Sequence, residues 1–321
     1  MTKKSVAVLV VAAASLAATP SYKAPRTAWG DPDLSGNYTN LYEAGTPMER
    51  PAQFEGRKLG DVTPEELKKF KLNIQETTIQ RFETPFDAPS NWWQDAFRLG
   101  ASAQAWLVTD PEDGHIPART ADGVARQRSA RQTVYAGGSD SWEDRSLYDR
   151  CITRGFPASG MPTIYGNSSR IVQGPGYIAI QYEMIHETRV IPIDKTPVKH
   201  LTSKHHLDMG DSRAHWDGDT LVVETTNFSD KASYRGSGPA MHITERYTRL
   251  DDKTVGVEIT VEDPGTWARP WTAALKMRPS EGPIYEYACH EANIGLQNIL
   301  EVARDEDAKA EKAAEAVARR K

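Results

Sequence analysis

The second half of the chain consists of short runs rich in β-branched and aromatic residues, and strong turn signals separate one run from the next. Such a succession with no intervening helix is typical of antiparallel strands connected as a meander. Asp217-Gly218, between two apolar runs, is the strongest two-residue hairpin signal. We expect about nine strands, over 169–173, 177–186, 188–193, 212–216, 219–228, 242–250, 254–262, 271–277 and 283–288.

About nine antiparallel strands are enough to close a barrel, which removes the exposed edges of a sheet. The sequence therefore predicts a mainly β fold: an antiparallel, lipocalin-like β-barrel with an irregular N-terminal arm and a few helices. Alternation places the apolar residues of 255–261 on the buried side of one strand, and it places His186 on the buried side of the run 177–186. A barrel of this size is either filled by side chains or holds one small ligand.

The distribution of residue types divides the chain into four segments. Residues 1–18 have the basic start, apolar run and small-residue end of a secretory signal peptide; the apolar run is about 13 residues, too short to span a membrane. Residues 19–150 form the arm with its helices and loops, 151–303 the barrel, and 304–321 a charged helical tail. The helices expected before the barrel are 63–70, 120–132 and 144–150.

Charge balance and cysteine content limit the partners and the compartment. The 321 residues carry 39 Lys and Arg against 44 Asp and Glu with no long basic run, so no nucleic-acid partner is expected. No segment after the signal is apolar enough to span a membrane. We expect a periplasmic or secreted protein, in which Cys151 and Cys289 form one disulfide rather than a zinc site.

Several enzyme classes lose their support because their motifs are absent. The sequence has no GxSxG elbow, no GxGxxG after a strand and no GxxxxGK[ST] loop. Serine esterase, dinucleotide and NTP chemistries are therefore not expected.

The first polar cluster is Glu183 to Arg189, at the end of an expected strand. His186 within it is a candidate general base, since an imidazole needs only a small shift to titrate near neutral pH. The alternative is a hydrogen-bonded core histidine, because a single inward imidazole is usually satisfied structurally.

The second polar cluster, 205–215, places Asp211, Arg213 and His215 on one face of a strand. An acid, a cation and an imidazole there could converge on a ligand carboxylate or phenol, so these three and His186 are the catalytic candidates. Two alternatives are an Asp–Arg pair that pins a loop and a metal site. The metal site would use His205, His206, Asp211 and His215. The spacing matches no helical HExxH pattern, so the main hypothesis includes no metal and no other cofactor.

The third polar cluster is 285–293, where Cys289 precedes His290. Sequence neighbours seldom have the geometry for proton transfer, so a bridged cysteine is favoured over a thiol nucleophile. The side chains expected to contact a substrate are Tyr182, Glu183, Trp216, Glu224, Tyr285 and His290. Five tryptophans form an aromatic wall for a sugar or aryl ligand in one interpretation and simply fill the core in the other: Trp92, Trp93, Trp216, Trp267 and Trp271.

Long motifs of this sequence resemble those of an exported, mostly uncharacterised bacterial protein family that is numerous in soil bacteria and sphingomonads. The motifs are DRC (149–151), RGFP (154–157), GDSRAHWDGDTLVVETTNF (210–228), TERYTR (244–249), VEDPGTWARPW (261–271) and YEYACHEANIGL (285–296). The resemblance covers most of the mature chain. The sequence is also similar, more distantly, to cofactor-independent sphingomonad decarboxylases that act on lignin-derived phenylcoumaran dimers.

The more distant resemblance implies loss of CO₂ from a side chain conjugated to a para-phenol. The phenol loses a proton, and the quinone methide that develops accepts the electrons without pyridoxal or metal. A base such as His186 or His215 and a carboxylate-orienting Arg213 are the groups such a reaction needs.

Three functional hypotheses follow. The leading one is an exported, cofactor-independent lyase, a decarboxylase of a phenolic or aromatic acid. The second is a periplasmic carrier of a small aromatic or hydrophobic ligand, which a barrel alone would explain. The third is a metal-assisted hydrolase.

Overall fold

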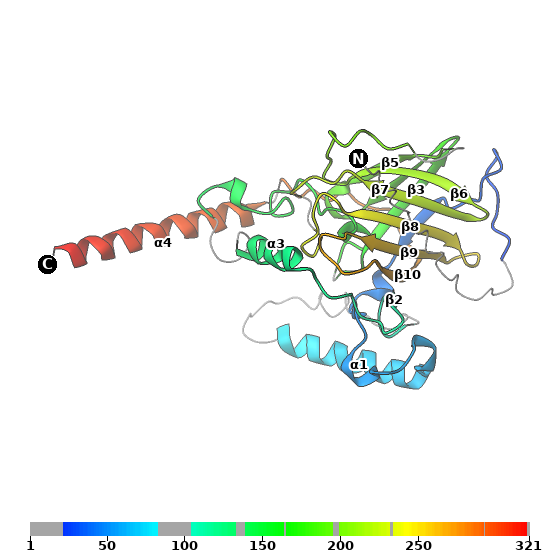
Figure 1. Ribbon diagram of the computed structural model, residues 1–321, viewed down its shortest axis with the longest axis horizontal. Coiled ribbons are helices and arrows are strands. Elements are labelled where there is room, and N and C mark those ends of the chain that lie inside the picture. The colour runs from blue at the N-terminus through cyan, green and yellow to red at the C-terminus, as the bar shows by residue number, and fades with distance from the viewer. Residues whose placement is uncertain are drawn as a thin grey trace, which may run out of the picture.

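The computed structural model describes residues 22–82, 104–132, 139–163, 165–194, 199–231, 234–291 and 293–319. These form an antiparallel barrel with helices outside it (Figure 1). The strands are β1 (Gly36–Thr39), β2 (Val108–Asp110), β3 (Ser168–Gly174), β4 (Tyr177–Tyr182), β5 (Thr188–Pro192), β6 (Asp211–Asp217), β7 (Thr220–Thr226), β8 (His242–Arg249), β9 (Val255–Glu262) and β10 (Trp271–Pro279). The helices are α1 (Pro64–Phe82), α3 (Ala121–Gln132) and α4 (Ile294–Ala318).

The strands form one sheet in the order β5-β4-β3-β1-β10-β9-β8-β7-β6, and β2 pairs with β10 beside this path. The two end strands of this order meet. Ile193, directly after β5, bridges Ala214 of β6, and the Asp194 N–H donates to the Ala214 carbonyl at 2.7 Å. This contact curls the sheet into a nearly closed barrel, which confirms the predicted fold class.

The barrel core follows the alternation read from the sequence. Val255, Val257, Ile259 and Val261 of β9 are all at most 3% exposed, whereas the residues between them are half-buried. Burial of such β-branched side chains stabilises the fold by roughly 1.5–3 kcal/mol for each one. The predicted inward face of this strand is confirmed.

The N-terminal region contributes two strands to the sheet as well as irregular chain. β1 lies between β3 and β10, so it bridges the two halves of the barrel. Tyr38 of β1 is buried, and its hydroxyl donates to the Leu34 carbonyl at 3.0 Å and accepts from Arg249 at 2.9 Å. This strand and β2 have only four and three residues, so long-range pairing holds them in place.

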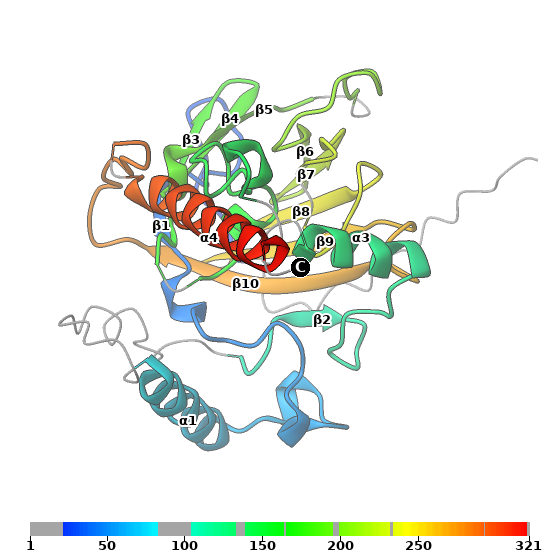
Figure 2. The same ribbon diagram turned by 90° about the vertical axis from the view of Figure 1, so that its left-hand side faces the viewer.

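Helix α1 packs on a second, small hydrophobic cluster away from the barrel. Phe54 contacts Phe70 edge to face at 5.1 Å between ring centroids, and Trp106 closes the cluster. The predicted capped start is confirmed, because Thr63 and Glu66 exchange backbone and side-chain hydrogen bonds. The helix continues to Phe82 instead of ending near Phe70. Figure 2 shows α1 beside the barrel, apart from its strands.

Two expected elements do not form and a third is shorter than expected. The strand over 177–186 ends at Tyr182, because Ile185 and His186 adopt positive φ and form a turn, so His186 is half-buried and not on an inward strand face. No strand forms over 283–288, where the Tyr287 N–H donates to His186 instead of to a neighbouring strand. The region 144–150 contains turns and no α-helix, whereas α3 confirms the helix expected near 120–132.

The C-terminal helix α4 begins ten residues before the expected tail and projects from the barrel (Figure 1). Its residues from Arg304 to Ala318 are all exposed, as a solvated charged helix requires. Within the described ranges, no helix has the length and apolar character needed to cross a membrane. The signal peptide expected over 1–18 lies outside these ranges.

A disulfide joins Cys151 to Cys289, whose Cα atoms are 5.7 Å apart. This confirms the predicted pairing. The bond ties the loop before β3 to the segment that leads into α4, across 138 residues of sequence.

Candidate ligand-binding site

A buried ion pair lies in the interior of the barrel. Arg189 of β5 contacts Glu245 of β8 at 2.6 Å, and their side chains are 3% and 0% exposed. Both residues take inward positions on their strands, next to Ile191 and to Ile243 and Tyr247. A buried charge is tolerated only when it is paired and its remaining polar atoms are hydrogen-bonded.

Neighbouring strands supply those remaining hydrogen bonds. The Arg189 guanidinium also donates to the hydroxyls of Tyr182 at 3.1 Å, Ser212 at 2.8 Å and Thr225 at 3.0 Å. The Tyr247 hydroxyl donates to the second oxygen of Glu245. Burial raises the pKa of Tyr182 to about 12, although the adjacent charge of Arg189 acts in the opposite direction. The network is therefore a satisfied structural core and not a site open to a ligand.

The barrel interior contains a small cavity. It has a volume of about 20 Å³ and lies beside Asn40, Tyr182, Tyr247 and Met277. This is room for about one water molecule, and the Asn40 Oδ1 beside it is buried without a hydrogen-bond partner. A ligand with a ring does not fit in this cavity.

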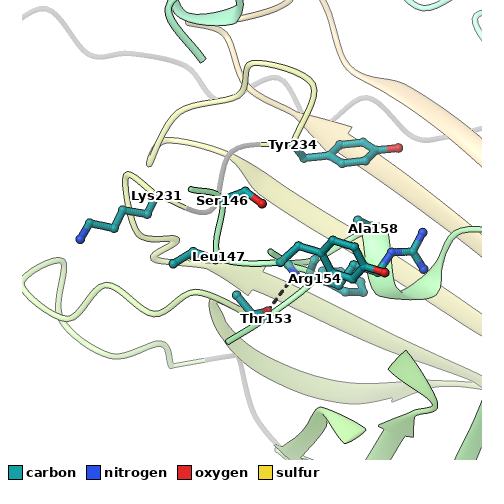
Figure 3. Close-up of a pocket in the computed structure, with 10 residues that line it drawn as sticks. Ser146, Leu147, Thr153, Arg154, Ala158, Lys231 and Tyr234 are labelled. Carbon is teal, nitrogen blue, oxygen red and sulfur yellow. Dashed lines mark hydrogen bonds between the residues drawn. The ribbon is translucent and has the colours of Figure 1, made fainter. Parts of the chain in front are cut away.

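A larger pocket of about 130 Å³ lies between the loop before β3 and the connection from β7 to β8 (Figure 3). These two segments form its walls. The lining residues are Ser146, Leu147, Tyr148, Thr153, Arg154, Gly155, Phe156, Ala158, Lys231 and Tyr234. Phe156 is also the boundary to the barrel interior, because the Arg189 guanidinium lies 3.9 Å from its ring centroid.

Local backbone structure presents Arg154 to the pocket. Gly155 has a φ of 77°, a left-handed conformation that favours glycine, and its N–H donates to the Thr153 hydroxyl at 2.8 Å (Figure 3). Behind this turn the Arg154 N–H donates to Glu187 at 3.4 Å. Burial lowers the pKa of the Arg154 guanidinium, and its Nη1 is buried without a hydrogen-bond partner.

Phenol side chains gather near Arg154. The Tyr148 and Tyr165 hydroxyls are 3.2 Å apart, and Tyr287 interacts with both. Burial raises the pKa of Tyr148, and the adjacent phenols act in the same direction. The disulfide between Cys151 and Cys289 holds together the two segments that carry Tyr148 and Tyr287.

His186 lies at the edge of this group. The backbone N–H of Tyr287 donates to its Nδ1 at 2.9 Å. A ring nitrogen that accepts a hydrogen bond carries no proton, so the neutral ring is protonated on Nε2. The structure therefore places His186 beside the segment that carries Tyr287, whose phenol interacts with Tyr148 of the pocket wall.

Asp211, Arg213 and His215 share one face of β6, as the alternation predicts, and that face is the outside of the barrel. Ser212 and Ala214 between them point inward, since Ser212 binds Arg189 and Ala214 is in the core. These three candidates are therefore on the opposite side of the barrel wall from the buried network.

Asp211 has a local structural role. Its carboxylate accepts from the Leu201 N–H at 2.7 Å and contacts His200 Nδ1 at 3.1 Å, so it holds the loop that precedes β6. The Arg213 Nε is 3.6 Å from the same carboxylate. This is the arrangement expected of an Asp–Arg pair that pins a loop.

Glu224 lies on the outer face of the neighbouring strand β7. Its carboxylate is 3.7 Å from His242. A hydrogen bond from His242, followed by the charges of His242, His200 and His215, lowers the pKa of Glu224. Glu224 therefore belongs to the same outer-face group as His215.

The residues of the metal alternative are not arranged as a ligand set. His205 and His206 are exposed, and His206 Nδ1 contacts the Phe228 carbonyl at 3.0 Å. Across the described part of the chain, no three His, Cys, Asp or Glu side chains are placed to hold a metal ion.

The other expected contact residues are dispersed. Glu183 accepts from the Ser168 N–H at 2.8 Å at the start of β3, while Tyr285 and His290 are exposed. Trp216 packs partly buried against the core. Two other tryptophans of the expected aromatic wall, Trp267 and Trp271, lie in the core. The remaining two, Trp92 and Trp93, are outside the described ranges.

The most informative residues of the site were not among the expected ones. Arg154 and Phe156 lie in the RGFP motif that carries part of the family resemblance, and this motif was the available signal. Arg189 and Glu245 could have been found from strand alternation, because each falls on the apolar side of its run.

Comparison with protein-family models finds no match, and comparison with curated proteins finds none either. Among solved structures, the chain is similar to the crystal structure of a mutant of the fluorescent protein UnaG, with 13% sequence identity and a TM-score of 0.23. The alignment covers 42% of this chain and 87% of that chain. A likeness of this size carries no argument about function, and the barrel assignment rests on the strand pairing described above.

Proposed function

We propose that the protein is an exported small-molecule-binding protein whose ligand occupies the pocket beside Arg154. The observation that carries the proposal is the contrast between two spaces. The cavity inside the barrel has about 20 Å³, whereas the pocket outside Phe156 has about 130 Å³ and is lined by Arg154, whose Nη1 is buried without a hydrogen-bond partner. Concave sites with aromatic walls and a few convergent polar groups are the usual form of a small-molecule site.

Export is part of the proposal. The disulfide between Cys151 and Cys289 is of the kind that persists in oxidising compartments. The signal-like residues 1–18 add independent support from the sequence. We infer that the mature protein works in the periplasm or outside the cell.

Filling the pocket tests where a ligand binds. Ala158→Phe adds a ring to a side chain of the pocket wall, and Ala268→Phe adds the same ring at an exposed position. Binding is measured by isothermal titration against a panel of small aromatic acids, amides and alcohols. We expect Ala158→Phe to weaken binding at least about tenfold and Ala268→Phe to leave it unchanged. Unchanged binding by Ala158→Phe, or no binding to any compound, would refute the proposal.

A second candidate is decarboxylation of the bound acid without a cofactor. The favouring observation is that Tyr287 links the pocket group to His186, since its phenol interacts with Tyr148 and its N–H binds the imidazole. In this version Arg154, and not Arg213, would orient the carboxylate. Mass analysis of the same panel decides between the candidates: recovery of every acid unchanged supports binding alone, and loss of one CO₂ mass, abolished by His186→Ala, supports the lyase.

A further inference from the structure

We infer that the pocket beside Arg154 selects a carboxylate that carries a single aromatic ring, and that Arg154 binds the carboxylate. The inference rests on the proposed binding function and adds the chemical class of the ligand. Three observations support it: the charge of the pocket wall, the volume, and the fixed aromatic side chains.

The charge of the lining residues favours an anion. Of the ten described residues that line the pocket, Arg154 and Lys231 are cationic and none is acidic. Glu187 lies behind the wall, where its carboxylate accepts a hydrogen bond from the Arg154 backbone N–H. The buried Nη1 of Arg154 has no hydrogen-bond partner. A ligand carboxylate would supply the acceptor, and a charge-assisted hydrogen bond of this kind is among the strongest available to a protein.

The two cations have different positions. Figure 3 shows the Lys231 side chain directed away from Arg154 and Tyr234. Lys231 is exposed, so its charge acts through solvent and is screened by salt. Arg154 is therefore the anchor, and Lys231 contributes to long-range attraction of an anion.

The volume limits the ligand to one ring. The pocket has about 130 Å³. An engineered apolar cavity of ~150 Å³ binds benzene, so this space accepts one benzene-sized ring. A two-ring compound would leave its second ring in solvent.

The aromatic walls are held in place from behind. Tyr234 stacks on Trp271 with an interplanar angle of 28° and a centroid distance of 6.4 Å. Phe156 is held by the Arg189 guanidinium at 3.9 Å. Walls that are already fixed lose little conformational entropy on binding, and flat aromatic side chains favour contact with another ring.

The test compares benzoate with benzamide, which has the same shape and no charge. Isothermal titration is performed on the disulfide-bonded protein, on Arg154→Gln and Lys231→Gln, and on Arg246→Gln as a control on the outer face. Arg154 makes no side-chain hydrogen bond at Nη1, so its replacement is expected to preserve the fold, which the thermal midpoint verifies. We expect benzoate to bind at least about tenfold tighter than benzamide to the unmodified protein.

Arg154→Gln should remove that preference while benzamide binding stays unchanged. Lys231→Gln should reduce benzoate affinity less than about threefold, and Arg246→Gln should have no effect. Equal binding of acid and amide overturns the inference and leaves the binding function standing. A preference that survives Arg154→Gln overturns the assignment of the anchor. If phenylalkyl amides and alcohols also fail to bind, the proposed function itself fails.

Discussion

Arg189 is the residue on which the interior of the barrel depends. It is paired with Glu245, and three hydroxyls and the Phe156 ring surround it. Because the pair has no access to water, the loss of either partner leaves a buried charge uncompensated. The same residue supports the pocket from behind through Phe156.

Removal of the acidic partner should be strongly destabilising. We expect Glu245→Gln to lower the free energy of unfolding by about 3–5 kcal/mol, because the buried guanidinium loses its counter-charge. Glu262→Gln on the next strand is the control: its carboxylate is half exposed and 4.0 Å from His242, so the cost should be within about 0.5 kcal/mol. Urea unfolding measures both. Equal effects of the two substitutions would contradict a buried ion pair.

We expect the protein to lose stability at alkaline pH because the phenol of Tyr182 is buried. Its pKa is raised to about 12 by burial, so the folded state favours the neutral phenol. The stabilisation is fully present below the unfolded pKa near 10 and is lost as the pH rises from about 10 to 12, by up to about 2–3 kcal/mol.

Tyr182→Phe should make this alkaline decline smaller when unfolding is measured from pH 8 to 12, and the buried phenol of Tyr247 should account for part of the decline that remains. Tyr177→Phe, on the exposed side of the same strand, should leave the decline as it is. An identical decline in Tyr182→Phe and the unmodified protein would show that the phenol is accessible to solvent.

For individual residues, the sequence predicts the environment of a side chain where strand alternation determines it. It does not predict the environment of a side chain that a turn positions. The position of Asp211, Arg213 and His215 on one face was predictable, but which side of the barrel wall that face occupies was not, because both sides of β6 carry polar side chains. The position of Arg154 depends on the turn at Gly155 and on a disulfide whose two cysteines are 138 residues apart in sequence.

The elements divide into those that hold the barrel and those that extend from it. Strands with strong alternation, such as β9, were predictable from their residues alone. The short strands β1 and β2 were not, because four and three residues have no readable pattern and their pairing is long-range. The strand β4 ends early because Ile185 and His186 take left-handed conformations, which the apolar pattern of the run does not reveal.

The exposed end of α4 should be dispensable for folding. Truncation after Ala303 removes residues that are exposed in this structure, so we expect the thermal midpoint to change by less than about 1 °C and ligand binding to stay the same. Truncation after Asn293 also removes the half-buried Leu296, Ile299 and Leu300, and it should lower the midpoint by several degrees. A large drop for the shorter truncation would indicate that the tail has a structural partner.

For the molecule as a whole, the disulfide connects the pocket loop, which precedes β3, to the segment that precedes α4. The chain-entropy model gives about 5 kcal/mol for a loop of this length. The pairing was predictable from the compartment and the number of cysteines. The place of the pocket was not, because it requires connecting segments from both halves of the barrel.

Reduction of the disulfide should therefore lower stability and ligand affinity together. We expect the urea midpoint to fall with reductant, and benzoate affinity to weaken because the loop of Thr153 and Arg154 loses its covalent tie. The variant with both Cys151→Ser and Cys289→Ser is the control, since reductant should no longer affect it. A midpoint that is insensitive to reduction would contradict a structural role for the bond.

The proposed ligand binds outside the barrel, in the pocket beside Arg154. A crystal structure of the protein soaked with benzoate would locate it. We expect benzoate density between Phe156 and Tyr234, with its carboxylate at Arg154 Nη1 and the Arg189–Glu245 pair intact. Benzoate density inside the barrel, with that pair broken, would show that this placement of the ligand is wrong.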